Sequence, residues 1–117
     1  MGTLFGLFTF IFGAGSQLPV YANTDNFVIV DVRTPAEFEE SHVTGAINVD
    51  FLNSEFRKKV AQLDKEKSYK VYCRSGNRSG QAMQLMKSIG FKDVENLGSL
   101  MQASQRLSRK CEGRNSC

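Results

Sequence analysis

The sequence predicts an α/β fold in which a small parallel sheet is flanked by helices on both faces. Short apolar runs rich in β-branched and aromatic residues alternate along the chain with stretches of helical periodicity. Strands that alternate with helices favour a parallel sheet, and runs that are apolar throughout are typical of strands buried on both faces. In open sheets of this kind, binding sites form beyond the carboxyl ends of the strands.

The first predicted strand covers residues 27–30, Phe-Val-Ile-Val, and ends at Asp31. A short helix from Pro35 to about residue 40 should follow. Thr34 suits its N-cap position, and Glu37, three residues later, completes a capping box.

The middle of the chain predicts a second strand at residues 46–49 and then an amphipathic helix at residues 54–63. Aromatic and aliphatic side chains recur in this helix at roughly helical spacing, with charged residues between them. We therefore expect these apolar side chains to lie in the core rather than to form a ligand site.

A third strand is predicted at residues 69–73 and a helix at residues 81–89, which stops at Gly90, a fitting C-cap. The alternating pattern of residues 91–96 predicts a fourth strand. A turn at residues 97–98 and a final helix from residue 99 to about residue 110 complete the expected order.

The chain of 117 residues is long enough for one domain, and its 41% hydrophobic and 23% charged residues are ordinary globular usage. The net charge of +3 comes from the last twelve residues, since basic and acidic side chains balance over residues 23–105. This balance excludes an extended nucleic-acid footprint. We expect a domain at residues 23–105 and a basic C-terminal tail at residues 106–117.

Residues 1–22 have the layout of a secretory signal peptide. An apolar run at residues 4–12 is followed by helix breakers and by Val20-Tyr21-Ala22, which predicts cleavage after Ala22. A periplasmic or otherwise exported protein without stable membrane insertion is then expected. A buried first helix and an uncleaved membrane anchor formed by residues 1–22 are the alternatives.

The chemistry is predicted to centre on Cys73, which follows an apolar run and precedes a basic, glycine-containing loop. Backbone amides and the positive end of a following helix lower the pKa of a thiol and hold anions. Arg74 and Arg78 add positive charge, and Gly76 permits the positive φ that a tight curl needs. The expected anion-binding loop consists of Arg74, Ser75, Gly76, Asn77 and Arg78. An inert cysteine at the end of a buried strand is the alternative.

Three stretches of the chain resemble the single-domain rhodanese family of sulfurtransferases, especially its small periplasmic type. They are residues 30–33 with Glu37 and Phe38, residues 42–48, and residues 72–79. The resemblance implies a rhodanese-like fold and a sulfurtransferase that needs no cofactor. Cys73 would take sulfur from thiosulfate, carry it as a covalent persulfide, and pass it to cyanide or another thiophilic acceptor. The partners would be these small molecules, and the protein would be a monomer.

Further side chains are candidates for supporting roles. Asp31, with Arg33, ends a strand near the loop and could support it by hydrogen bonds, although a structural role explains the pair equally well. His42 is the one histidine in the sequence, and we expect it to be structural. Cys111 and Cys117 form either a disulfide or two free thiols in a loose tail. Metal binding is not expected, because four converging ligands are lacking.

Two other functions are compatible with the pattern. A cysteine phosphatase or arsenate reductase generally needs one more residue in the loop, which would place the arginine at position 79, where this chain has Ser79. A binding or sensing module could use the same fold, although the intact Cys73 argues against an inactive one.

Overall fold

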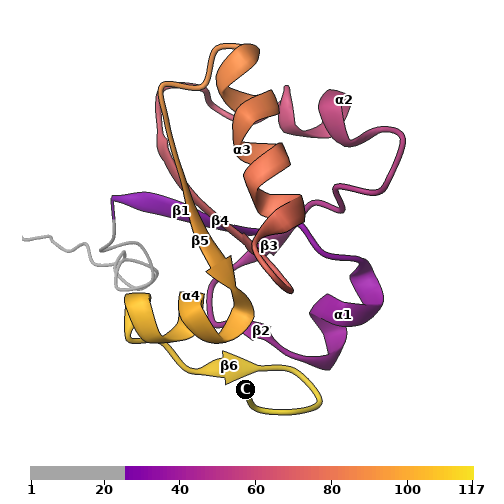
Figure 1. Cartoon of the computed structure of the whole chain (residues 1–117), viewed down its shortest axis with the longest axis vertical. Coiled ribbons are helices and arrows are strands. Elements are labelled where there is room, and N and C mark those ends of the chain that lie inside the picture. Colours follow the sequence, from indigo (N-terminus) through magenta and orange to yellow (C-terminus); the bar gives the residue numbers. More distant parts are fainter. Residues whose placement is uncertain (1–25) are drawn as a thin grey trace, which may run out of the picture.

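The computed structural model describes residues 26–117, so the expected leader at residues 1–22 lies outside the described residues. The arrangement of the helices and strands is shown in Figure 1. The elements are β1 (Phe27–Asp31), α1 (Pro35–Glu40), β2 (His42–Val43), β3 (Ile47–Asn48), α2 (Phe56–Val60), β4 (Ser68–Cys73), α3 (Asn77–Ser88), β5 (Asp93–Ser99), α4 (Leu100–Leu107) and β6 (Cys111–Glu112).

Four of the strands form a parallel sheet in the order β3-β1-β4-β5. One hydrophobic cluster joins one face of this sheet to α2 and α3, and a second cluster joins the other face to α4. Figure 1 shows this arrangement, with α2 and α3 on one side and α4 on the other. The predicted parallel sheet with helices on both faces is therefore confirmed.

Neighbouring residues of β4 belong to different cores because successive side chains of a strand point to opposite faces. Val71 and Cys73 belong to the cluster under α2 and α3, whereas Tyr72 belongs to the cluster under α4. All three side chains are fully buried. Cys73 is thus held by packing on both sides of the strand that carries it.

Several predicted boundaries were wrong. The helix after Cys73 begins at Asn77 rather than at residue 81, because Gly76 turns the chain with a φ of 97° and serves as the N-cap. The predicted turn at residues 97–98 is a bulge inside β5, which continues to Ser99. The last helix ends at Leu107 because Ser108 adopts a left-handed conformation with a φ of 52°.

The C-terminal residues add a second, small sheet that sequence analysis did not predict. Strand β6 pairs antiparallel with β2, with His42 opposite Glu112 and Val43 opposite Cys111. Cys111 and Cys117 form a disulfide that closes the last turn of the chain. Of the two alternatives for these cysteines, the structure has the disulfide, and the segment is docked on the domain.

Candidate active site

Cys73 lies where three elements meet at the carboxyl end of the sheet. It is the last residue of β4, its register partner on β5 is Ser99, and α3 begins four residues later. The loop between β4 and α3 therefore folds back over the sulfur. The sequence expectation that Cys73 stands at the carboxyl end of a strand, beneath a helix N-terminus, is met by this geometry.

The sulfur of Cys73 accepts hydrogen bonds from the loop and from the first turn of α3. The backbone N–H of Gly76 donates to Sγ at 2.9 Å, and the Ser79 hydroxyl lies 3.4 Å from Sγ. Amides that converge on one atom in this way form a nest for negative charge. The loop is thus arranged around a sulfur anion.

Two opposing influences act on the pKa of Cys73. Burial raises the pKa, because a buried anion loses its hydration. The Ser79 hydroxyl and the backbone amides of residues 79, 75 and 76 lower it by hydrogen bonding to the thiolate. The net effect is a pKa below the ordinary value for cysteine, which favours the nucleophilic form.

Asn96 on β5 holds the loop and the Ser79 hydroxyl in place. Its Nδ2 donates to the carbonyl of Gly76 at 3.1 Å, and its Oδ1 accepts from the Gly98 N–H at 2.9 Å. The same Oδ1 accepts from Ser79 Oγ at 2.7 Å, which is shorter than the 3.4 Å from that hydroxyl to Cys73 Sγ. The one Ser79 proton is therefore shared between Asn96 and the thiolate, and the hydroxyl and the loop amides act together on the sulfur.

The two arginines of the loop differ in their surroundings. Arg78 lies in the first turn of α3 and donates from Nη1 and Nη2 to the two carboxylate oxygens of Glu37 on α1, at 2.9 and 3.2 Å. These bonds, more than any other influence, hold the pKa of Glu37 down at about 2. The Arg74 side chain is 79% exposed, and its Nη1 lies 3.8 Å from Glu37 Oε2.

Asp31 and Arg33 form a buried ion pair at the end of β1. Arg33 Nε donates to Asp31 Oδ1 at 2.9 Å, and Nη2 donates to Oδ2 at 2.6 Å. The guanidinium also lies over the Tyr72 ring, with Cζ 5.6 Å from its centroid. The hydrogen bonds recorded for the Asp31 side chain go to Arg33 rather than to the Cys73 loop, which indicates a structural role.

His42 also has structural partners. Its ring stacks on Phe38 with 3.7 Å between centroids, Nδ1 lies 2.7 Å from the Phe38 carbonyl, and Nε2 lies 3.2 Å from Glu112 Oε2. Both ring nitrogens are thus engaged by groups other than Cys73. This agrees with the expected structural role.

A pocket of about 420 Å³ opens beside the loop. Cys73 itself is fully buried, but its chain neighbour Arg74 and its sheet neighbour Ser99 both line this pocket. The remaining lining comes from Arg33, from Glu37, Glu40 and Ser41 in and after α1, from the start of α4, and from residues 115–117. The pocket therefore borders residues next to Cys73, while the sulfur itself is not part of its lining.

The structure places the predicted loop residues next to Cys73. Asp31 and Arg33 lie instead at the end of β1, the strand beside β4. Sequence analysis missed Ser79, Asn96 and the contact of Glu37 with Arg78 as parts of the site. Ser79 belongs to residues 72–79, a stretch that resembles the family. That its hydroxyl faces Cys73 could be inferred only with the knowledge that α3 begins at Asn77. Asn96 gave no signal, because its role depends on the bulge in β5.

A parallel sheet that presents a thiolate in a closed, anion-holding loop defines an enzyme of the cysteine-dependent group-transfer class. The chain belongs to the Rhodanese-like domain family, whose family model matches residues 17–103.

Several curated relatives carry sulfurtransferase names. The thiosulfate sulfurtransferase PspE of Escherichia coli is 40% identical over 84 residues, which cover 72% of this chain and 78% of PspE. A sulfurtransferase of Allochromatium vinosum is 33% identical over 76 residues, which cover 65% of this chain and 69% of that protein. A solved structure described as a rhodanese with anions from E. coli has a TM-score of 0.57 and 38% identity, covering 65% of this chain and 89% of that one.

Proposed function

We propose that this protein transfers a sulfane sulfur from thiosulfate, or a similar donor, to a thiophilic acceptor through a persulfide on Cys73. The observation that carries the proposal is the hydrogen bond from the Gly76 backbone N–H to Cys73 Sγ, 2.9 Å long, at a cysteine whose pKa is lowered. The relatives that are named sulfurtransferases support the same reaction.

In the first half-reaction, the Cys73 thiolate attacks the outer sulfur of thiosulfate. A new S–S bond forms, the old S–S bond breaks, and sulfite leaves with the electron pair. The loop amides stabilise the negative charge before and after transfer, which is a preorganised electrostatic contribution. Because the sulfur is fully buried at rest, side chains around the pocket, with the exposed Arg74 as the first candidate, must move to admit the donor.

In the second half-reaction, the acceptor attacks the outer persulfide sulfur. Cyanide becomes thiocyanate, and Cys73 leaves as the thiolate that the loop already stabilises. Sulfur is the only atom transferred, so the cycle needs no external oxidant or reductant. The persulfide is the one covalent intermediate, and no cofactor is called for.

The size of the loop favours sulfur transfer over phosphate or arsenate chemistry. Four residues separate Cys73 from Arg78, and α3 begins within that interval, so the amides close directly on Sγ. A tetrahedral oxyanion bound above the sulfur would need a wider ring of amides. The same loop therefore suits a single additional sulfur atom.

We also propose export of the protein, with residues 1–22 as the signal. The Cys111–Cys117 disulfide supports this proposal, because disulfides persist in oxidising compartments. Among residues 26–117, no helix is long and apolar enough to cross a membrane. N-terminal sequencing of protein recovered from cells tests the proposal, with a start at Asn23 expected. A soluble cytoplasmic protein that still carries Met1 would contradict it.

The sulfurtransferase proposal is tested by mass measurement of purified protein after incubation with thiosulfate. The mass should rise by one sulfur atom, located on Cys73, and addition of cyanide should remove that sulfur as thiocyanate. The Cys73→Ser variant should do neither. Unchanged mass together with hydrolysis of an aryl phosphate would overturn the proposal, and full activity of Cys73→Ser would overturn the assignment of Cys73 as the nucleophile.

A further inference from the structure

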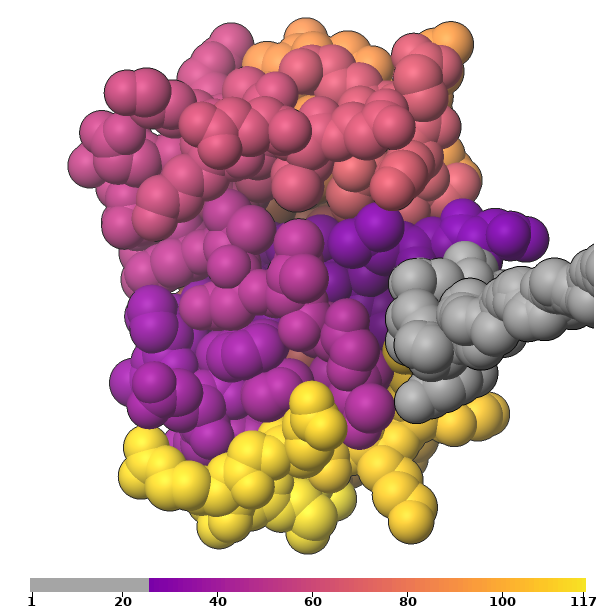
Figure 2. Space-filling view, turned by 180° about the vertical axis from the view of Figure 1, so that it is seen from behind, coloured from indigo at the N-terminus to yellow at the C-terminus, as the bar shows by residue number. Residues whose placement is uncertain are grey.

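The C-terminal segment, residues 111–117, packs against the end of α1. Its strand β6 pairs with β2, which follows that helix, and Figure 2 shows the C-terminal residues in yellow against the indigo surface that contains α1. The segment lies outside residues 17–103, the part of the chain that the family model matches. Its contacts with α1 are therefore an addition to the matched part of the domain.

Helix α1 is only six residues long, and its last four carbonyl groups need donors from beyond the helix. The residues that follow it supply two of them. The N–H of Ser41 donates to the Glu37 carbonyl at 3.2 Å, and His42 Nδ1 lies 2.7 Å from the Phe38 carbonyl. The Ser41 hydroxyl is buried and has no hydrogen-bond partner among the described residues, so it adds nothing to this cap. Two carbonyl groups at the end of α1 remain.

The C-terminal segment supplies the donors for both of these carbonyl groups. The N–H of Arg114 donates to the Glu39 carbonyl at 3.2 Å, and the N–H of Asn115 donates to the Glu40 carbonyl at 2.8 Å. Gly113 permits this close approach, because its φ is 128° and a Cβ there would lie 2.8 Å from the Glu39 carbonyl oxygen. Two stretches of chain that are far apart in the sequence thus complete one helix cap.

The segment also contacts the His42 ring. Glu112 lies opposite His42 in the pairing of β2 with β6, and its Oε2 is 3.2 Å from His42 Nε2. The other ring nitrogen faces the Phe38 carbonyl on α1. His42 is therefore held between α1 and the segment, which gives a structural reason for a histidine that the proposed sulfur transfer does not use.

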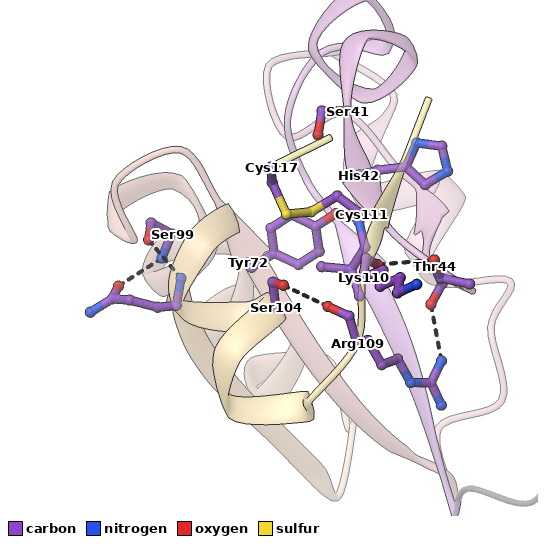
Figure 3. Close-up of a disulfide and its surroundings, with 12 residues drawn as sticks. Ser41, His42, Thr44, Tyr72, Ser99, Ser104, Arg109, Lys110, Cys111 and Cys117 are labelled. Atoms are coloured by element: carbon purple, nitrogen blue, oxygen red, sulfur yellow. Dashed lines mark hydrogen bonds between the residues drawn. A yellow bond between two sulfur atoms is a disulfide. The ribbon is translucent and has the colours of Figure 1, made fainter. Parts of the chain in front are cut away.

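Backbone hydrogen bonds and the Cys111–Cys117 disulfide hold the segment, without buried side chains. Its base is anchored independently of the disulfide, because the Lys110 carbonyl accepts from the N–H and the hydroxyl of Thr44, both at 2.9 Å. Figure 3 shows Lys110 and Thr44 beside the disulfide. Residues 112–117 are all exposed, and their conformational entropy opposes docking once the disulfide is opened. Opening it therefore favours their release from α1.

Helix α1 connects this cap to the Cys73 loop. Its residue Glu37 accepts hydrogen bonds from both terminal nitrogens of Arg78, which lies in the first turn of α3. These hydrogen bonds raise the pKa of Arg78 most strongly, and the charge of the Cys73 thiolate adds to the rise, so the guanidinium lies within reach of both anions. A helix as short as α1 has little stability of its own. Its capped end therefore helps to hold Glu37 against Arg78.

We propose that the disulfide-closed segment 111–117 positions Glu37 against Arg78 by capping α1, and that sulfur uptake by Cys73 is fully efficient only in the oxidised chain. The inference rests on the proposed sulfur transfer and adds the condition under which that transfer is efficient. A chain that is exported acquires its disulfide in an oxidising compartment. Sulfur transfer then reaches its full rate only after export.

The redox step is a thiol–disulfide exchange with a dithiol reductant. The two thiols of the reductant are oxidised to one disulfide, and Cys111 and Cys117 are reduced to two thiols. Residues 112–117 then leave α1, and the helix loses the donors to its last two carbonyl groups. Arg78 loses a fixed partner, so its charge is no longer held in one place beside the sulfur that receives the anionic donor.

The carboxyl pKa of Glu37, followed by NMR on the full resting chain, tests this link without sulfur transfer. In the oxidised chain the pKa is about 2, chiefly because of the hydrogen bonds from Arg78. A phosphine, which takes the disulfide oxidation onto itself as phosphine oxide, should raise the pKa toward the ordinary 4.5. It should also speed exchange of the Ser41 amide hydrogen, which is bonded to the Glu37 carbonyl. The Cys111→Ser, Cys117→Ser chain should show the raised pKa with and without the phosphine.

The rate of persulfide formation with thiosulfate tests the consequence for the active site. In the Cys111→Ser, Cys117→Ser chain, Cys73 is the one remaining cysteine, so the added sulfur is assigned to it. The rate should fall about fivefold, at the lower end of coupling between two sites. In a Glu37→Gln background, loss of the disulfide should change the rate little further, because Glu37 carries the effect.

Two glycine variants separate docking of the segment from its redox chemistry. Gly113→Ala displaces the segment while the disulfide stays intact, so it should raise the Glu37 pKa and slow persulfide formation in the same way. Gly90→Ala should do neither, because Gly90 also has a positive φ but its added Cβ would meet only the Lys65 side chain, at 3.4 Å. Where the serine chain does not fold, Gly113→Ala gives both measurements on the oxidised protein.

The outcomes distinguish this inference from the proposed function. An unchanged Glu37 pKa after the disulfide is opened overturns the cap as the link to the active site. A raised pKa with an unchanged rate of persulfide formation overturns the positioning role, and sulfur transfer stands. Oxidised wild-type protein that takes up no sulfur from thiosulfate overturns the proposed function itself, whatever the response of Glu37.

Discussion

Gly76 and Gly98 bring the Cys73 loop and the bulge of β5 into backbone contact. A Cβ atom added at Gly76 would lie 3.3 Å from the Cα of Gly98, and both glycines have positive φ, 97° and 96°. The loop can therefore rest on β5 only because Gly76 has no side chain at this contact, whereas a Cβ at Gly98 would meet the side chain of Gln102. The direction of the Gly76 N–H toward Sγ depends on the same turn.

Gly76→Ala should lower the free energy of unfolding by about 2–4 kcal/mol, from left-handed strain together with crowding. Urea unfolding measures this loss, and the rate of persulfide formation should fall with it. Gly90→Ala is the matched comparison, because Gly90 also has a positive φ but its added Cβ would meet only the flexible Lys65 side chain at 3.4 Å. Equal losses in the two variants would contradict crowding against Gly98.

Glu37→Gln should make the free energy of unfolding fall less steeply as the pH is lowered. Arg78 holds the pKa of Glu37 at about 2 in the folded protein, against an ordinary value of 4.5. A lowered carboxyl pKa stabilises the fold above about pH 4.5, and this stabilisation is lost as the pH falls toward 2. After allowance for partial exposure, the lost contribution is about 1–2 kcal/mol. Urea unfolding at several pH values should show a steeper fall in the wild type, and parallel profiles would refute this role of the pair.

Ser79→Ala should raise the pKa of Cys73 by a modest amount. Burial already raises that pKa, and the variant removes one of the hydrogen bonds that oppose it. Because Asn96 also accepts from the Ser79 hydroxyl, the expected rise is smaller than the full effect of a charged hydrogen bond. The pH dependence of alkylation by iodoacetamide measures it, with Ser88→Ala on the same helix as control. An unchanged pKa in Ser79→Ala would show that the amides alone lower the pKa of Cys73.

Asp31→Asn should destabilise the fold by about 3–5 kcal/mol, because it leaves the buried guanidinium of Arg33 without its charge partner. The double variant Asp31→Asn with Arg33→Met should recover part of this loss, as measured by urea unfolding. In folded protein at low temperature, the single variant should still form the Cys73 persulfide. Loss of persulfide formation in fully folded Asp31→Asn would instead assign the pair a direct role at the site.

The parts of the fold that could be predicted were those set by local chemistry. The Thr34 and Glu37 capping box is present as expected, and the apolar run ending at Cys73 is a central strand. The start of α3 was misplaced because Ser79 and Gly80 are poor helix formers, and tertiary packing overrode their propensity.

The C-terminal segment shows what sequence alone could not supply. Two-residue strands such as β2 and β6 are too short to give a periodic pattern, and their pairing joins residues that lie about seventy positions apart. The unused hydroxyl of Ser41 is likewise visible only when its surroundings are known. Long-range placement of this kind, rather than any local motif, assembles the pocket.

Full burial of Cys73 also determines how long the enzyme keeps its nucleophile in oxidising surroundings. Conversion of a thiolate to sulfinic or sulfonic acid is irreversible for most proteins, and its rate follows exposure as well as thiolate character. A peroxide in solution must reach the sulfur past the residues that bury it. Burial therefore slows oxidation of Cys73 relative to an equally activated cysteine that is exposed.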